Sequence, residues 1–280
     1  MPASVFAAVL FAALLHAGWN ALVKLGLDRF SSILFLALVQ GGIALLLLPF
    51  FEPPARPAWG WVVLGSALHS GYKLFLIRAY GHGDLSQVYP LARGAAPLIV
   101  ALAGALFLNE SLGATRTAAV LAIAGGIILM ARSSDASQPG ISRPALLFAL
   151  GTACFTASYT MADGVGARLA GSASGFTLWM FLLDGVFMLV YGLATRGSAA
   201  ILSLLPAWRG GLAAGSMSLG SYWIAIWAFT QAPLATVAAL RETSVLFAMM
   251  IGVCFLKEPV TAGRWLAAAM ILCGVLLMRL

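Results

Sequence analysis

Two arginines lie deep inside apolar segments of the sequence, where a permanent charge is costly. Arg93 lies in the apolar run 85–108 and Arg241 in the run 233–256. A guanidinium group presents a planar set of donors that matches the two oxygens of a carboxylate or the oxygens of a phosphate. Ionisable residues inside membrane segments most often serve function. The two arginines therefore indicate a binding site for an acidic group. Pro90 and Pro97 are expected to loosen the first of these segments.

Buried carboxylates offer a competing explanation of the same arginines. Glu242 follows Arg241 directly and is placed to pair with Arg93, and Asp184 is placed to pair with Arg241. Two such ion pairs would fix helix packing without any substrate. Asp184, Glu242 and Asp163 are also candidate proton or ion-pair sites, because a buried carboxyl group can hold and release a proton. For Asp163, near the end of its segment, snorkelling to lipid headgroups is the alternative.

Polar side chains form one continuous face in each of the segments 3–25 and 144–165. Residues three or four positions apart lie on the same side of a helix. The two faces consist of His16, Trp19, Asn20 and Lys24 in the first segment and of Thr156, Tyr159, Thr160 and Asp163 in the second. One polar face from each half is what a shared cavity needs, so we expect these residues to line one. Hydrogen bonds that only join helices are the alternative.

Aromatic and basic residues in three further segments complete the candidate site. His69 and Lys73 share one face of the segment 58–80.

We find no nucleophile–base constellation, metal-ligand spacing or phosphate loop in the sequence, so we expect no catalytic residues, metal or cofactor and no enzymatic activity. The candidate substrate-binding residues are His16, Trp19, Asn20, Tyr72, Lys73, Tyr89, Arg93, Tyr159, Tyr222, Trp223, Arg241 and Glu242.

The composition places these residues in an all-α integral membrane protein. Of the 280 residues, 62% are hydrophobic and 9% charged, whereas soluble domains carry about 25% charged residues. The net charge of +7 fits basic loops beside a membrane better than a nucleic-acid partner. The apolar runs have the length of helical spans and lack the alternation of barrel strands. Ten transmembrane helices are predicted at 3–25, 31–51, 58–80, 85–108, 113–131, 144–165, 173–195, 209–231, 233–256 and 261–279.

An internal repeat relates the two arginine segments. Arg93–Met130 aligns with Arg241–Met278 without a gap and with 13 identities in 38 positions, and 34–41 resembles 178–185. A polar linker at 132–143 separates a first five-helix repeat, residues 1–131, from a second, 144–280. Because each repeat has an odd number of spans, the two must be inverted, as in secondary transporters with a site near the midplane. Gly41-Gly42 and Gly125-Gly126 most simply allow close helix approach.

The short turns Leu108-Asn109-Glu110 and Leu256-Lys257-Glu258, each before an Ala/Gly-rich last helix, make the whole chain resemble the EamA family of the drug/metabolite transporter superfamily. The resemblance implies ten helices around a central cavity and transport, often export, of small amino-acid-like metabolites. It also implies a multi-pass protein of the cell (inner) membrane. The distantly related small multidrug resistance proteins carry an essential glutamate in their first helix, which 3–25 lacks. We expect Glu110 and Glu258 to complement the dipole of the helix that follows each.

The sequence therefore predicts a secondary transporter of a small anionic or zwitterionic metabolite that works by alternating access, in the direction of export. Its expected partners are the substrate, the lipid bilayer and protons or another coupling ion, with no nucleic acid; its oligomeric state is open between a monomer and a weak homodimer. A second hypothesis is an exporter of organic cations or amphiphilic drugs that uses aromatic faces with Asp184 or Glu242. A membrane scaffold or lipid-modifying enzyme is disfavoured, because no loop is long enough to build a site outside the bilayer.

Overall fold

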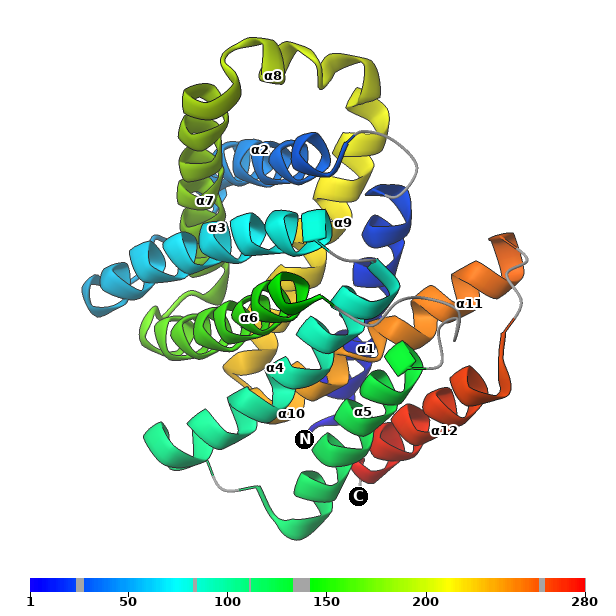
Figure 1. Cartoon of the computed structure of the whole chain (residues 1–280). Coiled ribbons are helices and arrows are strands. Elements are labelled where there is room, and N and C mark those ends of the chain that lie inside the picture. Colours follow the sequence, from blue (N-terminus) through cyan, green and yellow to red (C-terminus); the bar gives the residue numbers. More distant parts are fainter. Residues whose placement is uncertain (24–27, 83–84, 111, 133–141, 257–259, 280) are drawn as a thin grey trace.

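Helices make up the described part of this computed structural model, and no strand occurs in it (Figure 1). The all-helical prediction is therefore confirmed. The described residues are 1–280 except 24–27, 83–84, 111, 133–141, 257–259 and 280, and the side chains of 23, 80–81, 85–92, 131–132 and 255–256 are not described either. Lys24 and Glu258 thus lie outside the described residues. Tyr89 lies in a helix, but its side chain is outside them.

The helices follow the predicted segments closely. In the first half they are α1 (Ala3–Val23), α2 (Arg29–Leu47) with the 3₁₀ turn η1 (Leu48–Phe50), η2 (Arg56–Ala58), α3 (Trp59–His82), α4 (Leu85–Phe107) and α5 (Ala114–Arg132). In the second half they are α6 (Arg143–Leu169), α7 (Ala173–Arg196), α8 (Ala199–Leu202), η3 (Leu205–Ala207), α9 (Trp208–Phe229), α10 (Leu234–Arg241), α11 (Ser244–Leu256) and α12 (Ala262–Leu277).

The predicted helix at 233–256 is divided, whereas the one predicted to be loosened is intact. α10 ends at Arg241 and α11 begins at Ser244, so Glu242 and Thr243 lie in a break. α4 runs without interruption through Pro90 and Pro97. The prolines therefore do not interrupt α4; neighbouring structure can satisfy the carbonyls that a proline frees in a membrane helix.

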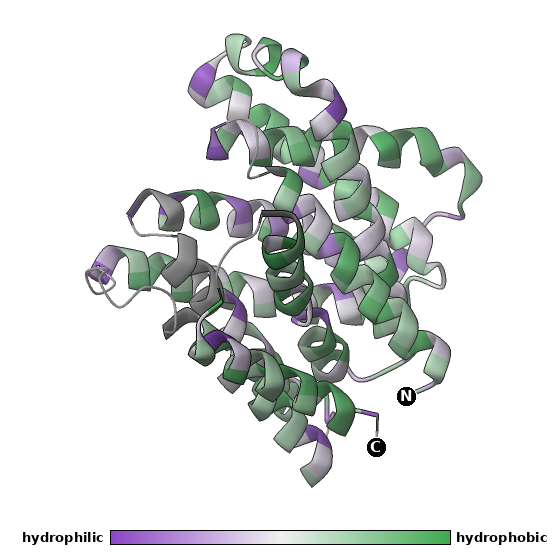
Figure 2. Ribbon diagram, turned by 90° about the vertical axis from the view of Figure 1, so that its right-hand side faces the viewer, coloured by the Kyte–Doolittle hydropathy of each residue, from purple (hydrophilic) through white to green (hydrophobic). Residues whose placement is uncertain are grey.

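The outer faces of the helices are apolar. Large hydrophobic residues such as Leu46, Leu102 and Phe107 are exposed there, and Figure 2 shows hydrophobic residues along much of the length of the helices. α3 is long enough to cross a membrane, but the polar residues on one of its faces lower its hydropathy. Within the described residues, the helical stretches long and apolar enough to cross are Ala3–Leu22, Arg29–Phe50, Arg143–Leu169, Ala173–Arg196, Ala199–Phe229 and Leu234–Cys254, and shorter apolar helices lie at Arg93–Phe107, Ala114–Met130 and Ala262–Leu277.

Helices from the two halves pack in matched pairs. α2 packs along α7, α5 along α12, α3 along α6 and α1 along α9, and Figure 1 shows α5 and α12 side by side. The set is symmetric. In both predicted halves, the first helix packs along the third of the other half, the second along the second and the fifth along the fifth. Each of these four pairs thus joins one predicted half to the other.

Glycines at matched repeat positions form the closest of these contacts. A Cβ atom at Gly126 would lie 2.7 Å from Ile271 Cγ1 and 2.9 Å from the carbonyl oxygen of Ala267. A Cβ atom at Gly274 would lie 2.6 Å from Ile123 Cγ1 and 2.7 Å from the carbonyl oxygen of Ala119. The two glycines thus face matched residues: Ile271 and Ala267 beside Gly126 correspond in the repeat to Ile123 and Ala119 beside Gly274.

The same exchange occurs between α2 and α7. A Cβ atom at Gly41 would lie 3.2 Å from Gly185 Cα and 3.3 Å from the carbonyl oxygen of Phe181. At Gly185, it would lie 3.1 Å from Gly41 Cα and 3.1 Å from the carbonyl oxygen of Ala37. By contrast, a Cβ atom at Gly42 would meet nothing within 4 Å. The expected close approach is therefore confirmed for Gly41 but not for Gly42.

Candidate functional site

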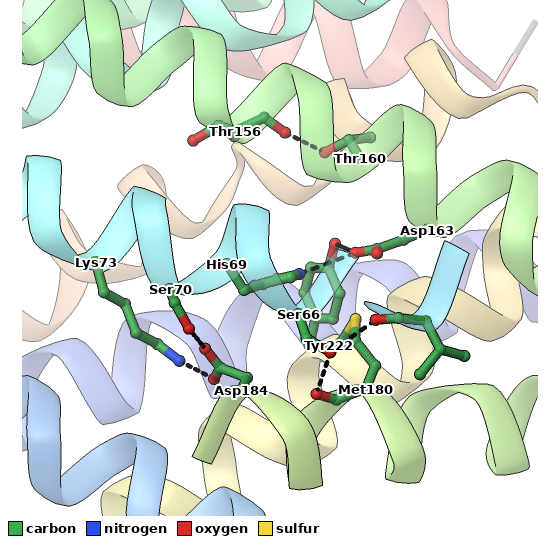
Figure 3. A network of polar contacts seen from close by, with 11 residues as sticks. Ser66, His69, Ser70, Lys73, Thr156, Thr160, Asp163, Met180, Asp184 and Tyr222 are labelled. Atoms are coloured by element: carbon green, nitrogen blue, oxygen red, sulfur yellow. Dashed lines mark hydrogen bonds and ion pairs between the residues drawn. The ribbon is translucent and has the colours of Figure 1, made fainter. Parts of the chain in front are cut away.

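α3 turns one polar face toward α6 and α7 (Figure 3). Its members recur every three or four residues, the spacing of a single helical face. The hydroxyl of Ser66 donates to the carbonyl oxygen of Met180 at 2.8 Å, and each other member contacts a carboxylate. These four residues, all buried, are Ser66, His69, Ser70 and Lys73.

Asp163 on α6 joins α3 to α9. Its Oδ2 atom lies 2.9 Å from His69 Nε2 and accepts a hydrogen bond of 2.6 Å from the hydroxyl of Tyr222. The side chain is fully buried, so the snorkelling alternative was wrong. A side chain at Gly65 would run into Asp163 Oδ1. The absence of a side chain at Gly65 thus lets the carboxylate lie against α3, where His69 reaches it.

Asp184 on α7 binds a different cation from the one expected. Ser70 donates to its Oδ1 atom at 2.8 Å, and Lys73 Nζ contacts its Oδ2 atom. The predicted pair of Asp184 with Arg241 was wrong. α3 packs along α7, and that packing brings Lys73, one turn beyond His69, to Asp184. Asp184 is fully buried, so this ion pair is shielded from solvent.

Arg93 on α4 forms the second charged cluster. Its Nε atom lies 3.2 Å from Glu242 Oε2, which confirms the predicted Arg93–Glu242 pair. Its Nη2 atom contacts His16 Nε2 on α1 and lies 3.3 Å from Ser244 Oγ on α11. Arg93 is therefore held by α1, by α11 and by the break between α10 and α11.

His16 receives two donors but has one acceptor. Trp19 Nε1 lies 3.3 Å from His16 Nδ1, and Arg93 contacts the other ring nitrogen. A neutral imidazole ring accepts through only one nitrogen, so only one of the two contacts is a hydrogen bond at a time. The charged donor Arg93 forms the stronger bond. Asn20 is turned to its own helix, where its Nδ2 atom donates to the carbonyl oxygen of His16 at 2.7 Å.

Arg241 extends the cluster toward the aromatic residues. Its guanidinium carbon lies 4.6 Å from the centre of the Tyr222 ring, a cation–π geometry. The Tyr222 ring in turn meets Tyr159 edge-on at 5.8 Å, and Glu242, which follows Arg241 directly, pairs with Arg93. The two arginines at matched repeat positions thus converge on one place.

The break at Glu242 and Thr243 follows from local hydrogen bonding. The amides of Glu242 and Thr243 donate to carbonyl oxygens three residues earlier, at 3.1 Å each, which is the 3₁₀ pattern and is often found at hinges. The Thr243 hydroxyl donates to the carbonyl oxygen of Leu240 at 2.7 Å. Such bonds from a side chain compete with the helical ladder, and here they accompany its interruption beside Arg93.

An aromatic wall separates the two charged clusters. Tyr159 stacks on His69 with ring centres 4.1 Å apart and meets Tyr72 and Tyr222 edge-on at 5.6 Å and 5.8 Å. Phe181 packs on the Tyr222 ring at 5.7 Å. Tyr72, Tyr159 and Tyr222 of the predicted site therefore come together, as the sequence pattern indicated.

Trp223 lies away from this wall. Its Nε1 atom donates to Ser174 Oγ at 2.9 Å, and its ring meets Phe51 edge-on at 5.2 Å. These contacts adjoin a cavity of about 530 Å³ that includes Phe51 and Ser174 in its lining, with Arg168 at the end of α6. Trp223 follows Tyr222 directly and so points about 100° away around the helix.

Sequence reasoning left four contributing residues out of the candidate set. His69 had been noted beside Lys73, and Ser66 and Ser70 share its helical face, so the spacing alone was a usable signal. Ser244, which contacts Arg93, follows the break, and the apolar pattern of that segment gave no sign of an interruption.

Glu110 contacts a helix other than the one that follows it in sequence. Its Oε2 atom accepts from the amide of Leu234 at 2.8 Å, and Oε1 pairs with Arg168 Nη1 at 2.6 Å. It thus complements the first turn of α10, whereas the sequence had pointed to α5. The expectation of a dipole role was correct in kind but wrong in the helix concerned.

Comparisons with known proteins agree with this architecture. A model of the EamA-like transporter family matches residues 3–132 and 143–280. The chain is 26% identical over 250 residues to the uncharacterized transporter YwfM of Bacillus subtilis (strain 168). The aligned region covers 85% of this chain and 80% of that protein. A solved crystal structure with 16% sequence identity superimposes with a TM-score of 0.78 over 99% of this chain and 96% of the other; at that identity the likeness concerns the fold alone.

Proposed function

Because the chain belongs to the EamA-like transporter family, we propose that it is a secondary transporter of a small carboxylate-bearing metabolite. The substrate is anionic or zwitterionic and amino-acid-like, and it leaves the cell by alternating access. The family and the name of the bacterial relative point to a membrane transporter rather than an enzyme. Substrate class, direction and mechanism are our proposal.

The main support for a carboxylate-bearing substrate is that Arg93 and Arg241 lie close to one another. Both are buried, both come from matched repeat positions, and Glu242 links them, because it follows Arg241 in the chain and pairs with Arg93. A guanidinium fork matches a carboxylate, and the rings of Tyr159 and Tyr222 lie beside it to hold the body of a small molecule. A site with a few charged groups against an aromatic wall is the usual form of a small-molecule site.

The reciprocal glycine contacts support alternating access by two related halves. Gly126 and Gly274 exchange equivalent partners between α5 and α12, and so do Gly41 and Gly185 between α2 and α7. Two halves that meet through such interfaces can rock about them, with the substrate between, as inverted-repeat transporters do. The break at Glu242 lies in the helix that carries Arg241, and it supplies a point where that helix can bend.

Export of organic cations is the weaker alternative. Asp184 or Glu242 would have to bind the cation, but Asp184 already holds Ser70 and Lys73, and Glu242 lies against Arg93 and beside Arg241. A cationic substrate would have to displace them. An acidic substrate meets two arginines instead.

A metabolite profile tests the proposal. Cells with and without the protein are compared for small molecules inside and in the medium, and each candidate is then measured with purified protein in liposomes. We expect a carboxylate-bearing metabolite to accumulate in the medium. Arg93→Gln and Arg241→Gln should each abolish its transport while the protein stays folded.

Arg116→Gln provides the control, because Arg116 is exposed on α5 and outside the site. Its transport should match that of the original protein. Transport of organic cations alone, or unchanged transport in both site variants, contradicts the proposed function.

A further inference from the structure

Glu242 contacts Arg93 through charge but without an aligned hydrogen bond. The Nε and Oε2 atoms lie 3.2 Å apart, yet Glu242 Oε2 has no hydrogen-bond partner within the described residues. Both side chains are nearly fully buried. A buried ion pair compensates for lost hydration only when its geometry is good and further hydrogen bonds assist. An incoming carboxylate with two aligned oxygens would therefore bind Arg93 better than Glu242 does.

The position of Glu242 in the chain allows it to leave. It follows the last residue of α10, and its amide donates to the carbonyl oxygen three residues back rather than four. A small rotation at this break moves Glu242 without disturbing a continuous helix. Ser244, on the far side of the break, keeps a contact with Arg93 at 3.3 Å.

The charges of the described site balance. Lys73, Arg93 and Arg241 carry three positive charges, and Asp163, Asp184 and Glu242 three negative ones. An added anion would leave one uncompensated negative charge in a buried place, which is costly. One proton taken up by the displaced carboxylate removes that charge.

We propose that Glu242 is an internal competitor for the substrate's carboxylate: it holds Arg93 in the empty transporter and takes up one proton when an anionic carboxylate substrate displaces it. In this step the Arg93–Glu242 ion pair breaks, an Arg93–substrate ion pair forms, and Glu242 changes from carboxylate to carboxylic acid. One substrate anion and one proton then move together. The inference rests on the proposed function and adds to it the coupling ion and the residue that carries it.

Few groups surround Glu242 that could take the proton instead. Arg93 on α4 contacts it and Arg241 precedes it in the chain. Tyr159 on α6 lies near it, and His16 on α1 contacts Arg93 rather than Glu242. Tyr222 on α9 lies against Arg241, and α5, which also packs on α10, carries no titratable group between Arg116 and Arg132. Because the others are arginines or phenols, His16 is the competing proton acceptor, and proton uptake that persists in Glu242→Gln would point to it.

Chemical rescue tests the displacement without knowledge of the natural substrate. The purified full-length protein is melted in detergent with sodium acetate or with sodium chloride at equal ionic strength. Glu242→Ala should melt lower than the original protein in chloride, and acetate should raise its melting temperature as the acetate concentration increases. The original protein should respond less at neutral pH, because Glu242 competes. Arg93→Gln combined with Glu242→Ala should show no acetate effect.

Proton uptake tests the coupling. Acetate is added to the protein in weakly buffered solution with phenol red at pH 7, where acetate itself stays ionised. We expect about one proton taken up per acetate bound by the original protein and by the control Arg116→Gln, and none by Glu242→Gln. No acetate rescue in Glu242→Ala, or proton uptake that persists in Glu242→Gln, overturns the inference.

The two proposals fail separately. If no carboxylate metabolite is transported but acetate rescue and proton uptake are as expected, the proposed function fails and the displacement stands. If Arg93→Gln abolishes transport of a carboxylate but Glu242→Gln neither loses proton uptake nor alters its pH dependence, only the present inference fails.

Discussion

α4 and the pair α10–α11 begin from one repeated sequence and end as different structures. Residues 93–97 read Arg-Gly-Ala-Ala-Pro, and the matched residues 241–245 read Arg-Glu-Thr-Ser-Val. The first segment stays helical despite its proline, and the second is interrupted. Gly94 lies so close to α5 that a Cβ atom there would be 3.1 Å from Ile128 Cγ1, whereas its counterpart Glu242 lies in the break and pairs with Arg93.

The difference separates scaffold from site. Where the halves meet through α5 and α12, matched residues make matched contacts. Where the arginines lie, three small residues of the first half correspond to three polar ones of the second, and the symmetry is lost. Matched segments can thus share an origin while one supplies Arg93 and the other its partner Glu242.

The largest expected effect is an unequal response to loss of the two arginines. Arg93→Gln leaves Glu242 buried without its cation, which costs about 3–5 kcal/mol of stability. Arg241→Gln removes mainly the contact with the Tyr222 ring, at a cost of about 0.5–2 kcal/mol. Thermal unfolding of both variants in detergent measures the difference. Arg93→Gln combined with Glu242→Gln should recover part of the loss, and equal losses in the two single variants would contradict the assigned partners.

The α5–α12 contact should respond equally in both halves. Gly126→Ala and Gly274→Ala each place a methyl group against a backbone carbonyl and an isoleucine at 2.6–2.9 Å, and such overpacking typically costs about 1–3 kcal/mol. Gly125→Ala is the matched control, since its Cβ atom would meet only Met270 Cε, at 3.4 Å. Unfolding in a denaturing detergent gives the three values. A clear difference between Gly126→Ala and Gly274→Ala would show that the contact is not reciprocal.

A smaller effect is expected when the break is made more like α4. Thr243→Ala copies Ala95 of the first half and removes the hydroxyl bond to the carbonyl oxygen of Leu240, worth about 1 kcal/mol. Alanine favours the helix by several tenths of a kcal/mol, so the net change in stability should be small. Amide hydrogen exchange at residues 240–246 should slow because the helix becomes more continuous. Exchange that stays the same or quickens would show that Thr243 does not maintain the break.

The sequence was sufficient for part of this arrangement and not for the rest. The apolar runs predict the helices, and the proximity of Glu242 to Arg241 helped to identify the Arg93–Glu242 pair. The partner of Asp184 depends on which helices become neighbours. Because α3 lies along α7, Lys73 rather than the expected Arg241 pairs with Asp184. The break likewise depends on side-chain bonds of Thr243 that compete with the helix, and apolar periodicity does not register them.

The smallest expected effect on stability concerns the residues that cap the starts of α2 and α7, Asp28 and Ser172. These two residues occupy matched positions when 34–41 is aligned with 178–185. Asp28 Oδ1 accepts from the amide of Ser31 at 3.3 Å, and Ser172 Oγ accepts from the amide of Gly175 at 3.0 Å. Partial burial acts to raise the pKa of the Asp28 carboxyl, but hydrogen bonds from Ser31 and the charge of Arg196 outweigh it, so the pKa is lowered. The stability that this cap contributes is therefore present above the pKa of an unfolded aspartate, about 3.9, and is lost as the pH falls through the lower folded value.

Asp28→Ser should remove this pH dependence by giving α2 the cap of α7. The Asp28–Arg196 pair is about half exposed and 3.4 Å long, so its share is small, about 0–1 kcal/mol. Melting temperatures from pH 3 to 7 should differ between the variant and the original protein at the neutral end and converge at the acidic end, because a protonated Asp28 can no longer accept as a charged cap. Ser172→Ala provides the comparison: it should lower stability by a similar amount at every pH, since a serine cap has no charge to lose. A gap for Asp28→Ser that stays constant down to pH 3 would mean that the two caps act alike, by hydrogen bonding alone.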